Sequence, residues 1–482
     1  MGFNSKDYLL GQIDKQHIRT KKSRYKLDLD HEEYHLSDEL RREILSSDIQ
    51  TLQNLVREGR TTYAEIAMCF WNETIRQKRY NAVISLNETI VQEAEELVFD
   101  EEHDLLYGMP VLVKDNISVK GMPVTAGAAV LRDYIAEEDA ELIQLLKEKG
   151  ALILGKTNLT EWANFMSTDS SNGYSAVGGQ TMHPLGQFDV GGSSAGSAAA
   201  AALSLSPVTV GSETAGSIIY PASQNGVVGL KPTLGLISQD GIIPISKTHD
   251  TAGPIAKTVK DTYLLFKGMA SAVSEEAEWS EAGFKGVKTG ILENESIKSL
   301  YREEDEEIIE DVRQKLKEAG AIPSEYSLDE KALEVDYVPV LKYEFNTGIK
   351  SFFNQSRTHP LTLETIRAFN EEEGEDQTAP FNQELLIQSA GVEETAEDIT
   401  QIITSNQTVT RQALEKAFDS VDVLLTLSNY ATAVYSASGY PAVTVPGYVR
   451  ATGEPIGITL IGQDGEDVRL MELAYALEQI IQ

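Results

Sequence analysis

Short apolar runs that alternate with a helical pattern constrain the fold of this chain most strongly. Each run carries turn signals at its ends, and its length is typical of a buried strand. Between the first two, "DAELIQLLKEKG" places Leu142, Leu145 and Leu146 on one helical face, with Gly150 as its stop. The runs are "GMPVLVKDN" (108–116), "ALILGKTN" (151–158) and "SPVTVGSE" (206–213).

Strand, helix and strand in alternation predict an α/β fold. We expect a mixed, mostly parallel twisted sheet covered on both faces by helices. Later residues repeat the pattern: "EEDEEIIEDVRQKLKEAG" (303–320) has a helical period, and "YPAVTVPG" and "IGITLIG" read as strands. No linker rich in Pro, Gly or Ser interrupts the chain. One large domain over residues 61–482 is therefore expected.

Residues 1–60 are predicted to form an N-terminal helical extension. They are polar and charged, and the clearest helical part is "SDELRREILSSDIQTLQNLVREG" (37–59). Ser37 is a candidate cap and Gly59 a candidate stop. One helix is expected between them.

Charge and composition exclude several classes of function. The formal net charge of −34 repels phosphate backbones and argues against a nucleic-acid partner. No stretch approaches the ~18 continuous apolar residues that a membrane span needs. The charged N-terminus does not read as a secretion signal, so a cytoplasmic location without membrane contact is expected. Cys69 is the single cysteine, which excludes an internal disulfide and a cysteine metal cluster.

"HEEYH" (31–35) fits the H-E-x-x-H zinc pattern, with His31 and His35 one helical turn apart. No apolar helical pattern runs through the segment to bury a metal, and it precedes the cap at Ser37. We therefore interpret the two histidines as solvated and expect no metal site.

Small hydroxyl-bearing residues gather in two places, "VGGSSAGSAAAAALSL" (190–205) and "GSETAGSIIYPAS" (211–223). "GSSAG" matches the G-x-S-x-G elbow of α/β-hydrolases with Ser194 as nucleophile, but no buried strand precedes it. The downstream "THD" (248–250) also has its acid and histidine in reversed order. A phosphate-binding loop is disfavoured too, because no lysine follows Gly196.

A third interpretation joins both serine clusters to Lys114, which ends the apolar run "PVLVK". Burial lowers the pKa of a lysine because it penalises the charged form. A neutral lysine is a competent base at neutral pH, and Ser–Lys pairs replace Ser–His–Asp in some hydrolases. This pairing accounts for the lack of a histidine beside either cluster.

The two clusters and their surroundings resemble the amidase signature family of serine hydrolases. The resemblance is carried by "GGSSAGSAAAAALSLSPVTVGSETAGSIIYPASQNGVVGLKPT", and "GMPVLVKDN", "GALILGKTNLTEWANF" and "DTAGPIAKTVKD" follow the order of that family. It spans roughly residues 50–482. It implies the amidase signature fold, with a signature core at about 105–260 and a variable substrate-pocket region at about 330–440.

The resemblance also implies which residues act. Its Ser–Ser–Lys triad falls on Lys114, on a bridging serine with a cis peptide bond, Ser193, and on the nucleophile, Ser217. Ser193 would pass the proton of Ser217 to neutral Lys114, since a hydroxyl both donates and accepts. Ser194 and Glu213 would support these groups. The expected oxyanion hole consists of the backbone N–H groups of Thr214, Ala215, Gly216 and Ser217.

Two departures from the family pattern are visible. Many members have "GTDTGGSIR" where this chain has "GSETAGSII", so Glu213 and Ile219 replace an acid–arginine pair and Ala215 replaces a glycine. "TNLTEWANF", "GYSAVGGQTMHP" and "SQDGIIPISKTHDTAGP" are most similar to the peptide amidase branch, which removes the terminal amide from peptides.

The function expected from the resemblance is hydrolysis of a carboxamide to a carboxylate and ammonia or an amine through an acyl-serine. No cofactor is expected, and the substrate is a small-molecule or peptide amide. One alternative is the glutamine-hydrolysing component of a tRNA-dependent amidotransferase. Another is a catalytically inactive binding protein on the same scaffold. Oligomeric state is not predicted.

Overall fold

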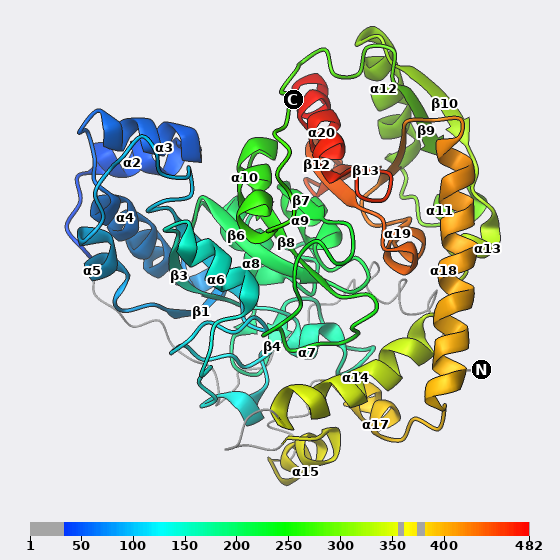
Figure 1. Ribbon diagram of the computed structural model, residues 1–482, viewed down its shortest axis with the longest axis horizontal. Helices are drawn as coiled ribbons and strands as arrows, with labels where there is room; N and C mark the ends of the chain where they lie inside the picture. Colours follow the sequence, from blue (N-terminus) through cyan, green and yellow to red (C-terminus); the bar gives the residue numbers. More distant parts are fainter. Residues whose placement is uncertain (1–32, 355–360, 374–380, 482) are drawn as a thin grey trace.

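The structure is a computed structural model that describes residues 33–354, 361–373 and 381–481 (Figure 1). Within these residues eleven strands form one sheet in the order β1-β3-β2-β6-β8-β7-β12-β13-β11-β9-β10, and β4 pairs with β5 separately. The strands are β1 (Val83–Leu86), β2 (Pro110–Lys114), β3 (Leu152–Thr157), β4 (Tyr174–Ser175), β5 (Gly179–Gln180), β6 (Val208–Glu213), β7 (Val228–Lys231), β8 (Thr251–Ala256), β9 (Lys288–Leu292), β10 (Ile322–Tyr326), β11 (Val423–Leu427), β12 (Ala442–Val449) and β13 (Pro455–Ile461).

The predicted α/β architecture with a mixed sheet is confirmed. The parallel pairs stand in two blocks, β3-β2-β6 and β11-β9-β10. Strands between and beside these blocks pair antiparallel. Helical crossovers account for the parallel pairs, as where α6 joins β2 to β3.

Helices cover both faces of the sheet (Figure 1). Thr209 Oγ1 of β6 donates to Ser197 O of α8, while its neighbours Val208 and Val210 point to the opposite face and join the main core. The helices are α2 (Asp38–Ser46), α3 (Ile49–Arg57), α4 (Tyr63–Arg76), η1 (Lys78–Tyr80), α5 (Ile90–Glu95), η2 (Ala129–Leu131), α6 (Glu141–Glu148), α7 (Glu161–Asn164), α8 (Ala195–Ala202), α9 (Ile219–Asn225), α10 (Val259–Met269), α11 (Glu295–Lys298), α12 (Asp305–Glu318), α13 (Glu330–Leu333), α14 (Val338–Asn354), α15 (Leu363–Glu373), α17 (Glu384–Ala390), α18 (Ala396–Phe418), α19 (Thr432–Ser438) and α20 (Asp467–Ile481).

The single helix expected over residues 37–59 is two helices, α2 and α3. Ser37 caps the first as predicted, since its side chain accepts from Leu40 N. The chain then turns extended at Ser47, and Asp48 caps α3 by accepting from Thr51 N. A strong internal cap therefore overrides a continuous helical pattern. The boundary predicted at residue 60 stays a prediction.

The other predicted helices form where the apolar spacing places them. In α12 the buried residues include Ile308, Ile309 and Val312. In α6, Leu142 and Leu146 are buried as expected, but Leu145 is half-buried and Ile143 takes its place in the core. No helix in the described part of the chain has both the length and the apolar character to span a membrane.

Candidate active site

Lys114 ends β2 with its amine enclosed between the two serine clusters. Its side chain is fully buried. Nζ lies 2.8 Å from Ser193 Oγ and 2.9 Å from Ser194 Oγ. It also contacts Ser212 of β6, at 3.0 Å from the carbonyl oxygen and 2.9 Å from Oγ. Among the described residues no carboxylate forms an ion pair with this amine.

Burial lowers the pKa of the Lys114 ammonium to about 7, because the interior stabilises the neutral amine. The negative charges of Asp250 and Glu213 oppose this shift in part. Near neutral pH a substantial fraction of Lys114 is therefore uncharged. The burial anticipated from the sequence is present.

Ser193 lies at the end of the loop that leads into α8. The peptide bond Gly192–Ser193 is cis, as the family resemblance implies. Ser193 O accepts from Thr160 N at 3.0 Å, which ties this loop to the residue before α7. Ser194 Oγ donates to Ser212 O at 3.0 Å and accepts from Lys114. Its position suits support of the lysine, the role expected for it.

Ser217 lies on the loop between β6 and α9, beside the first serine cluster. Its carbonyl oxygen accepts from Ser194 N at 3.2 Å, and its side chain is buried. Among the described contacts no side-chain hydrogen bond joins Ser217 Oγ to Ser193 Oγ. The structure thus brings Lys114, Ser193 and Ser194 into direct contact and holds Ser217 next to them through the backbone.

Glu213 supports the turn of the Ser217 loop. Its Oε2 accepts from Ile218 N at 2.6 Å and from Ile219 N at 3.0 Å, at the start of α9. Burial raises the pKa of this carboxyl, although these backbone N–H groups stabilise its charged form. Ile219 therefore contributes a backbone contact where many relatives carry an arginine.

Three of the four expected oxyanion donors have no hydrogen-bond partner among the described residues. Across the described chain, no hydrogen bond takes up the backbone N–H of Thr214, Ala215 or Ser217. Gly216 has φ +89°, a left-handed conformation that only glycine adopts readily. Its N–H lies against the Glu213 carboxylate and stabilises the charge there. Gly216 is thus a weaker candidate donor than its neighbours.

Asp250 is a residue of this site that sequence reasoning missed. Its Oδ1 accepts from Thr214 Oγ1 at 2.6 Å, and its Oδ2 accepts from Ile245 N and Ser246 N. Burial raises its pKa to about 6, against these hydrogen bonds. The sequence pattern points to Asp250 only within "THD", as a partner for histidine. His249 is buried with a pKa lowered to about 4 and contacts Ser246, not a nucleophile.

Ser212 and Asn116 were also missed. Asn116 Nδ2 donates to Ser212 Oγ at 3.0 Å, and this hydroxyl also contacts Lys114. Asn116 lies two positions after Lys114 in its motif, and Ser212 lies one position before Glu213. Both residues lie near the ends of predicted strands, and this position could have identified them as candidates for the site.

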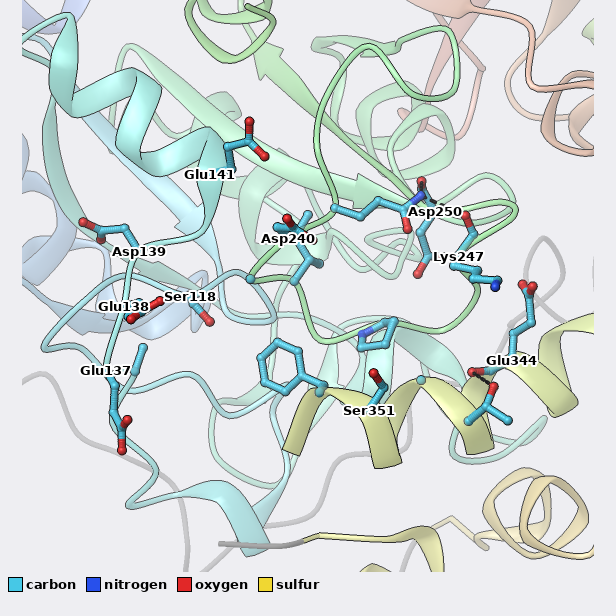
Figure 2. Close-up of a pocket in the computed structure, with 18 of the residues that line it drawn as sticks. Ser118, Glu137, Glu138, Asp139, Glu141, Asp240, Lys247, Asp250, Glu344 and Ser351 are labelled. Atoms are coloured by element: carbon cyan, nitrogen blue, oxygen red, sulfur yellow. Dashed lines mark hydrogen bonds between the residues drawn. The ribbon is translucent and has the colours of Figure 1, made fainter. Parts of the chain in front are cut away.

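A cavity of about 1110 Å³ lies beside this site (Figure 2). Asp250 belongs to both, and α14 supplies one wall with Tyr343, Glu344 and Phe352. Carboxylates dominate the lining, and Lys247 is the cation among them. The acidic residues are Glu137, Glu138, Asp139, Glu141, Asp240, Asp250 and Glu344.

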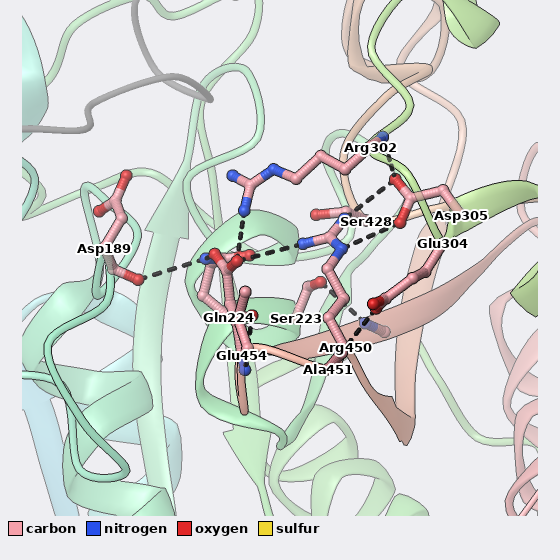
Figure 3. A network of polar contacts seen from close by, with 12 residues as sticks. Asp189, Ser223, Gln224, Arg302, Glu304, Asp305, Ser428, Arg450, Ala451 and Glu454 are labelled. Carbon is pink, nitrogen blue, oxygen red and sulfur yellow. Dashed lines mark hydrogen bonds and ion pairs between the residues drawn. The ribbon is translucent and has the colours of Figure 1, made fainter.

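A polar network connects the Ser193 loop to α9 and to the ends of β12 and α12 (Figure 3). Asp189 accepts from Gly191 N at 2.9 Å and from Tyr220 Oη at 3.0 Å. Its carbonyl oxygen accepts from Gln224 of α9, which also donates to Glu454 Oε1 at 2.7 Å. The loop and α9 are therefore held together.

Arg450 continues this network. It forms two hydrogen bonds with fully buried Asp305, at 2.9 and 3.0 Å, and lies 3.5 Å from Glu454. Such a bidentate pair fixes the ends of β12 and α12 against each other. The network anchors the scaffold and does not reach Lys114.

No group of three or more His, Cys, Asp or Glu in the described residues could hold a metal ion. His31 of "HEEYH" lies outside the described residues, and His35 is exposed.

Comparison with known proteins identifies the family of the chain. The family model described as Amidase matches residues 67–471. A solved structure of an amidase family protein from Bacillus anthracis is similar at 33% identity and a TM-score of 0.86, covering 91% of this chain and 92% of that one. The native peptide amidase of Stenotrophomonas maltophilia is similar at 32% identity and a TM-score of 0.83, covering 90% and 97%.

One relative carries a different function. It is the A component of the glutamyl-tRNA(Gln) amidotransferase of Alkaliphilus metalliredigens, 31% identical over 83% of this chain and 89% of its own length. The chain belongs to the amidase family, and it is an enzyme that hydrolyses carbon–nitrogen bonds in amides.

Proposed function

We propose that this amidase uses Ser217 as nucleophile, Ser193 as proton relay and neutral Lys114 as base. One observation carries the proposal: a fully buried amine lies 2.8 Å from the Ser193 hydroxyl without an ion-pair partner among the described residues. A base in this position accepts a proton because its own charge is destabilised by burial.

The contacts of Lys114 favour one direction for the relay. A neutral amine has two N–H donors and one lone pair. Ser212 O can only accept, and Ser194 Oγ already donates to that carbonyl, so both call for N–H groups from Lys114. The lone pair is then left for one of the two remaining hydroxyls, Ser193 Oγ or Ser212 Oγ, and of these Ser193 belongs to the proposed relay. Ser193 can give its proton to Lys114 and accept that of Ser217.

The reaction then follows in two steps. Ser217 Oγ attacks the carboxamide carbon as its proton passes through Ser193 to Lys114. The C–N bond breaks when the same path returns the proton to the leaving nitrogen, so ammonia departs and an acyl-serine remains. Water attacks the acyl-serine by the same route and releases the carboxylate.

The free backbone N–H groups of Thr214, Ala215 and Ser217 support an oxyanion hole on this loop. They lie next to the nucleophile and have no partner in the described chain. A donor aimed at the developing negative charge is worth about 3–4 kcal/mol of barrier. Glu213 holds the loop in this shape through α9.

We propose a C-terminally amidated peptide as the substrate class. The similarity to the Stenotrophomonas maltophilia peptide amidase supports this choice. Glutamine hydrolysis within an amidotransferase is the second candidate, favoured by the relative from Alkaliphilus metalliredigens. The net charge of −34 speaks against docking onto tRNA.

Ammonia release from a panel of peptide amides, aliphatic amides and glutamine tests both parts. Wild type should turn over peptide amides fastest. Ser217→Ala should lose activity, whereas Ser194→Ala should keep a measurable fraction because it removes contacts that position Lys114 and Ser212 but no member of the proposed relay. Turnover that survives Ser217→Ala would refute the nucleophile. A wild type that binds amides but never hydrolyses them would favour the inactive binding protein.

A further inference from the structure

Asn429 carries a buried side-chain N–H2 group with no hydrogen-bond partner in the described part of the chain. Its residue is fully buried, and Nδ2 is among the buried polar atoms without a partner. Leaving such a group unpaired costs about 1–3 kcal/mol. A donor kept at that cost is ready for an acceptor that arrives with a ligand.

Asn429 faces the loop that carries the nucleophile. A Cβ atom placed on Gly216 would lie 2.8 Å from Asn429 Nδ2 and 3.5 Å from Thr432 Oγ1. Gly216 immediately precedes Ser217. The unpaired donor is therefore within a few ångströms of the reacting segment, although 213 positions separate the two residues in sequence.

The backbone holds Asn429 rigidly. It lies between β11 and α19, where its carbonyl oxygen accepts from Thr432 N at 2.9 Å. The preceding residue, Ser428, donates its N–H to Gly457 O at 2.9 Å and its hydroxyl lies 3.5 Å from Asn429 Oδ1. In this arrangement Oδ1 faces the Ser428 hydroxyl and the N–H2 side of the amide lies toward Gly216.

We propose that Asn429 is a specificity-determining residue that donates to a substrate carbonyl oxygen next to the reacting carboxamide. This inference rests on the proposed function. In the proposed mechanism the N–H groups of the Ser217 loop donate to the reacting carbonyl oxygen. Asn429 is then available to recognise the substrate group next to it. In a peptide amide that group is the preceding peptide carbonyl, an acceptor. In a free amino acid amide it is an ammonium, which cannot accept a hydrogen bond.

Three amides of matched shape test the inference. N-acetyl-leucinamide offers the second carbonyl, leucinamide offers an ammonium, and 4-methylpentanamide offers neither. Asn429→Leu should lower kcat/KM for N-acetyl-leucinamide relative to 4-methylpentanamide about tenfold, as expected for one lost hydrogen bond. Asn429→Asp should lower the same ratio and raise the relative kcat/KM of leucinamide.

Asn72→Leu is the matched control. Asn72 is also buried, but it lies in α4 and its Nδ2 is paired with Tyr34 O at 2.7 Å. Its substitution should leave the substrate ratios unchanged. An equal loss on all three substrates, or unchanged ratios in both Asn429 variants, would overturn the inference.

Binding separates this inference from the catalytic proposal. In a Ser217→Ala background, calorimetry should show N-acetyl-leucinamide bound about tenfold more weakly after Asn429→Leu, with 4-methylpentanamide unaffected. This result stands even if wild type hydrolyses none of the amides, in which case only the catalytic proposal fails. Identical binding with and without Asn429, or no binding of N-acetyl-leucinamide, would overturn the role of Asn429.

Discussion

Three fully buried lysines lie at or next to the ends of strands of the sheet, and they differ in what their amines contact. Lys156 lies 3.3 Å from Asp115, an ion pair. Lys231 donates to backbone carbonyls, which can only accept, and burial lowers its pKa to about 8. Lys114 alone among the three meets serine hydroxyls, which can give a proton back. The hydroxyl contacts therefore single out Lys114 as the base of the proposed mechanism, whereas the contacts of the other two lysines suit a structural role.

The pH dependence of activity should report the pKa of Lys114. Since the neutral amine is the active form and its pKa is lowered to about 7, kcat/KM should rise tenfold per pH unit below that value and level off above it. Stopped assays of ammonia between pH 5 and pH 9 measure the profile. Lys114→Met should abolish the rising limb with the activity, and a wild-type profile that stays flat at acid pH would contradict a lysine base.

At the scale of elements, the small residues of the two clusters let three segments meet. A Cβ on Gly196 of α8 would lie 2.4 Å from Ala82 O, and one on Gly211 of β6 would lie 3.0 Å from Ser194 Oγ. The close packing of β2, β6 and α8 is what brings Lys114 to the serines. The small residues at these positions are therefore needed for close packing of the segments, in addition to the hydroxyl groups that the serines supply.

Gly216 and Gly59 both have left-handed backbones, so alanine at each position tests whether backbone strain alone affects catalysis. Gly216→Ala introduces strain and also a Cβ 2.8 Å from Asn429 Nδ2, so the Ser217 loop or the Asn429 side chain must shift, and kcat/KM should fall about 100-fold. Gly59→Ala has similar strain at φ +68° with no atom within 4 Å. It should cost about 1–2 kcal/mol in free energy of unfolding and leave kcat/KM intact. Equal kinetic effects would contradict the role of the loop.

Spacing of apolar residues predicted individual helices and strands, because it depends only on residues that are close in sequence. The strand ending in Lys114 and the apolar face of α12 follow from spacing alone. The break between α2 and α3 could have been read from the cap at Asp48, which competes with the helical period. Contacts such as Thr214 with Asp250, or Gly216 with Asn429, depend on the order of strands in the sheet. The periodicity of the sequence does not reveal the order of the strands, so Asp250 and Asn429 were not predicted as site residues.

At the scale of the whole molecule, the charge of −34 acts through self-repulsion in the folded state. The screening length falls from about 30 Å at 0.01 M salt to about 3 Å at 1 M. The midpoint of thermal unfolding should therefore rise with NaCl over this range, and by a similar amount with KCl. A midpoint that falls, or one that responds to only one cation, would contradict general screening.

The acidic cavity beside the site adds a local part to this field. Its carboxylates line a space that also includes Asp250, whose side chain accepts a hydrogen bond from Thr214 of the Ser217 loop (Figure 2). The negative charge is therefore spread over the molecule and also gathered beside the candidate active site. Screening acts on both, whereas the fully buried amine of Lys114 is far less exposed to salt.

The most direct measurement is the position of the acyl group on the enzyme. Wild type is quenched in acid during turnover of an activated amide such as a p-nitroanilide, and the digested protein is mapped by mass spectrometry. One added acyl mass is expected on the peptide that contains Ser217, and none in Ser217→Ala. An acyl group on Ser193 or Ser194, or full turnover without any adduct at Ser217, would contradict it.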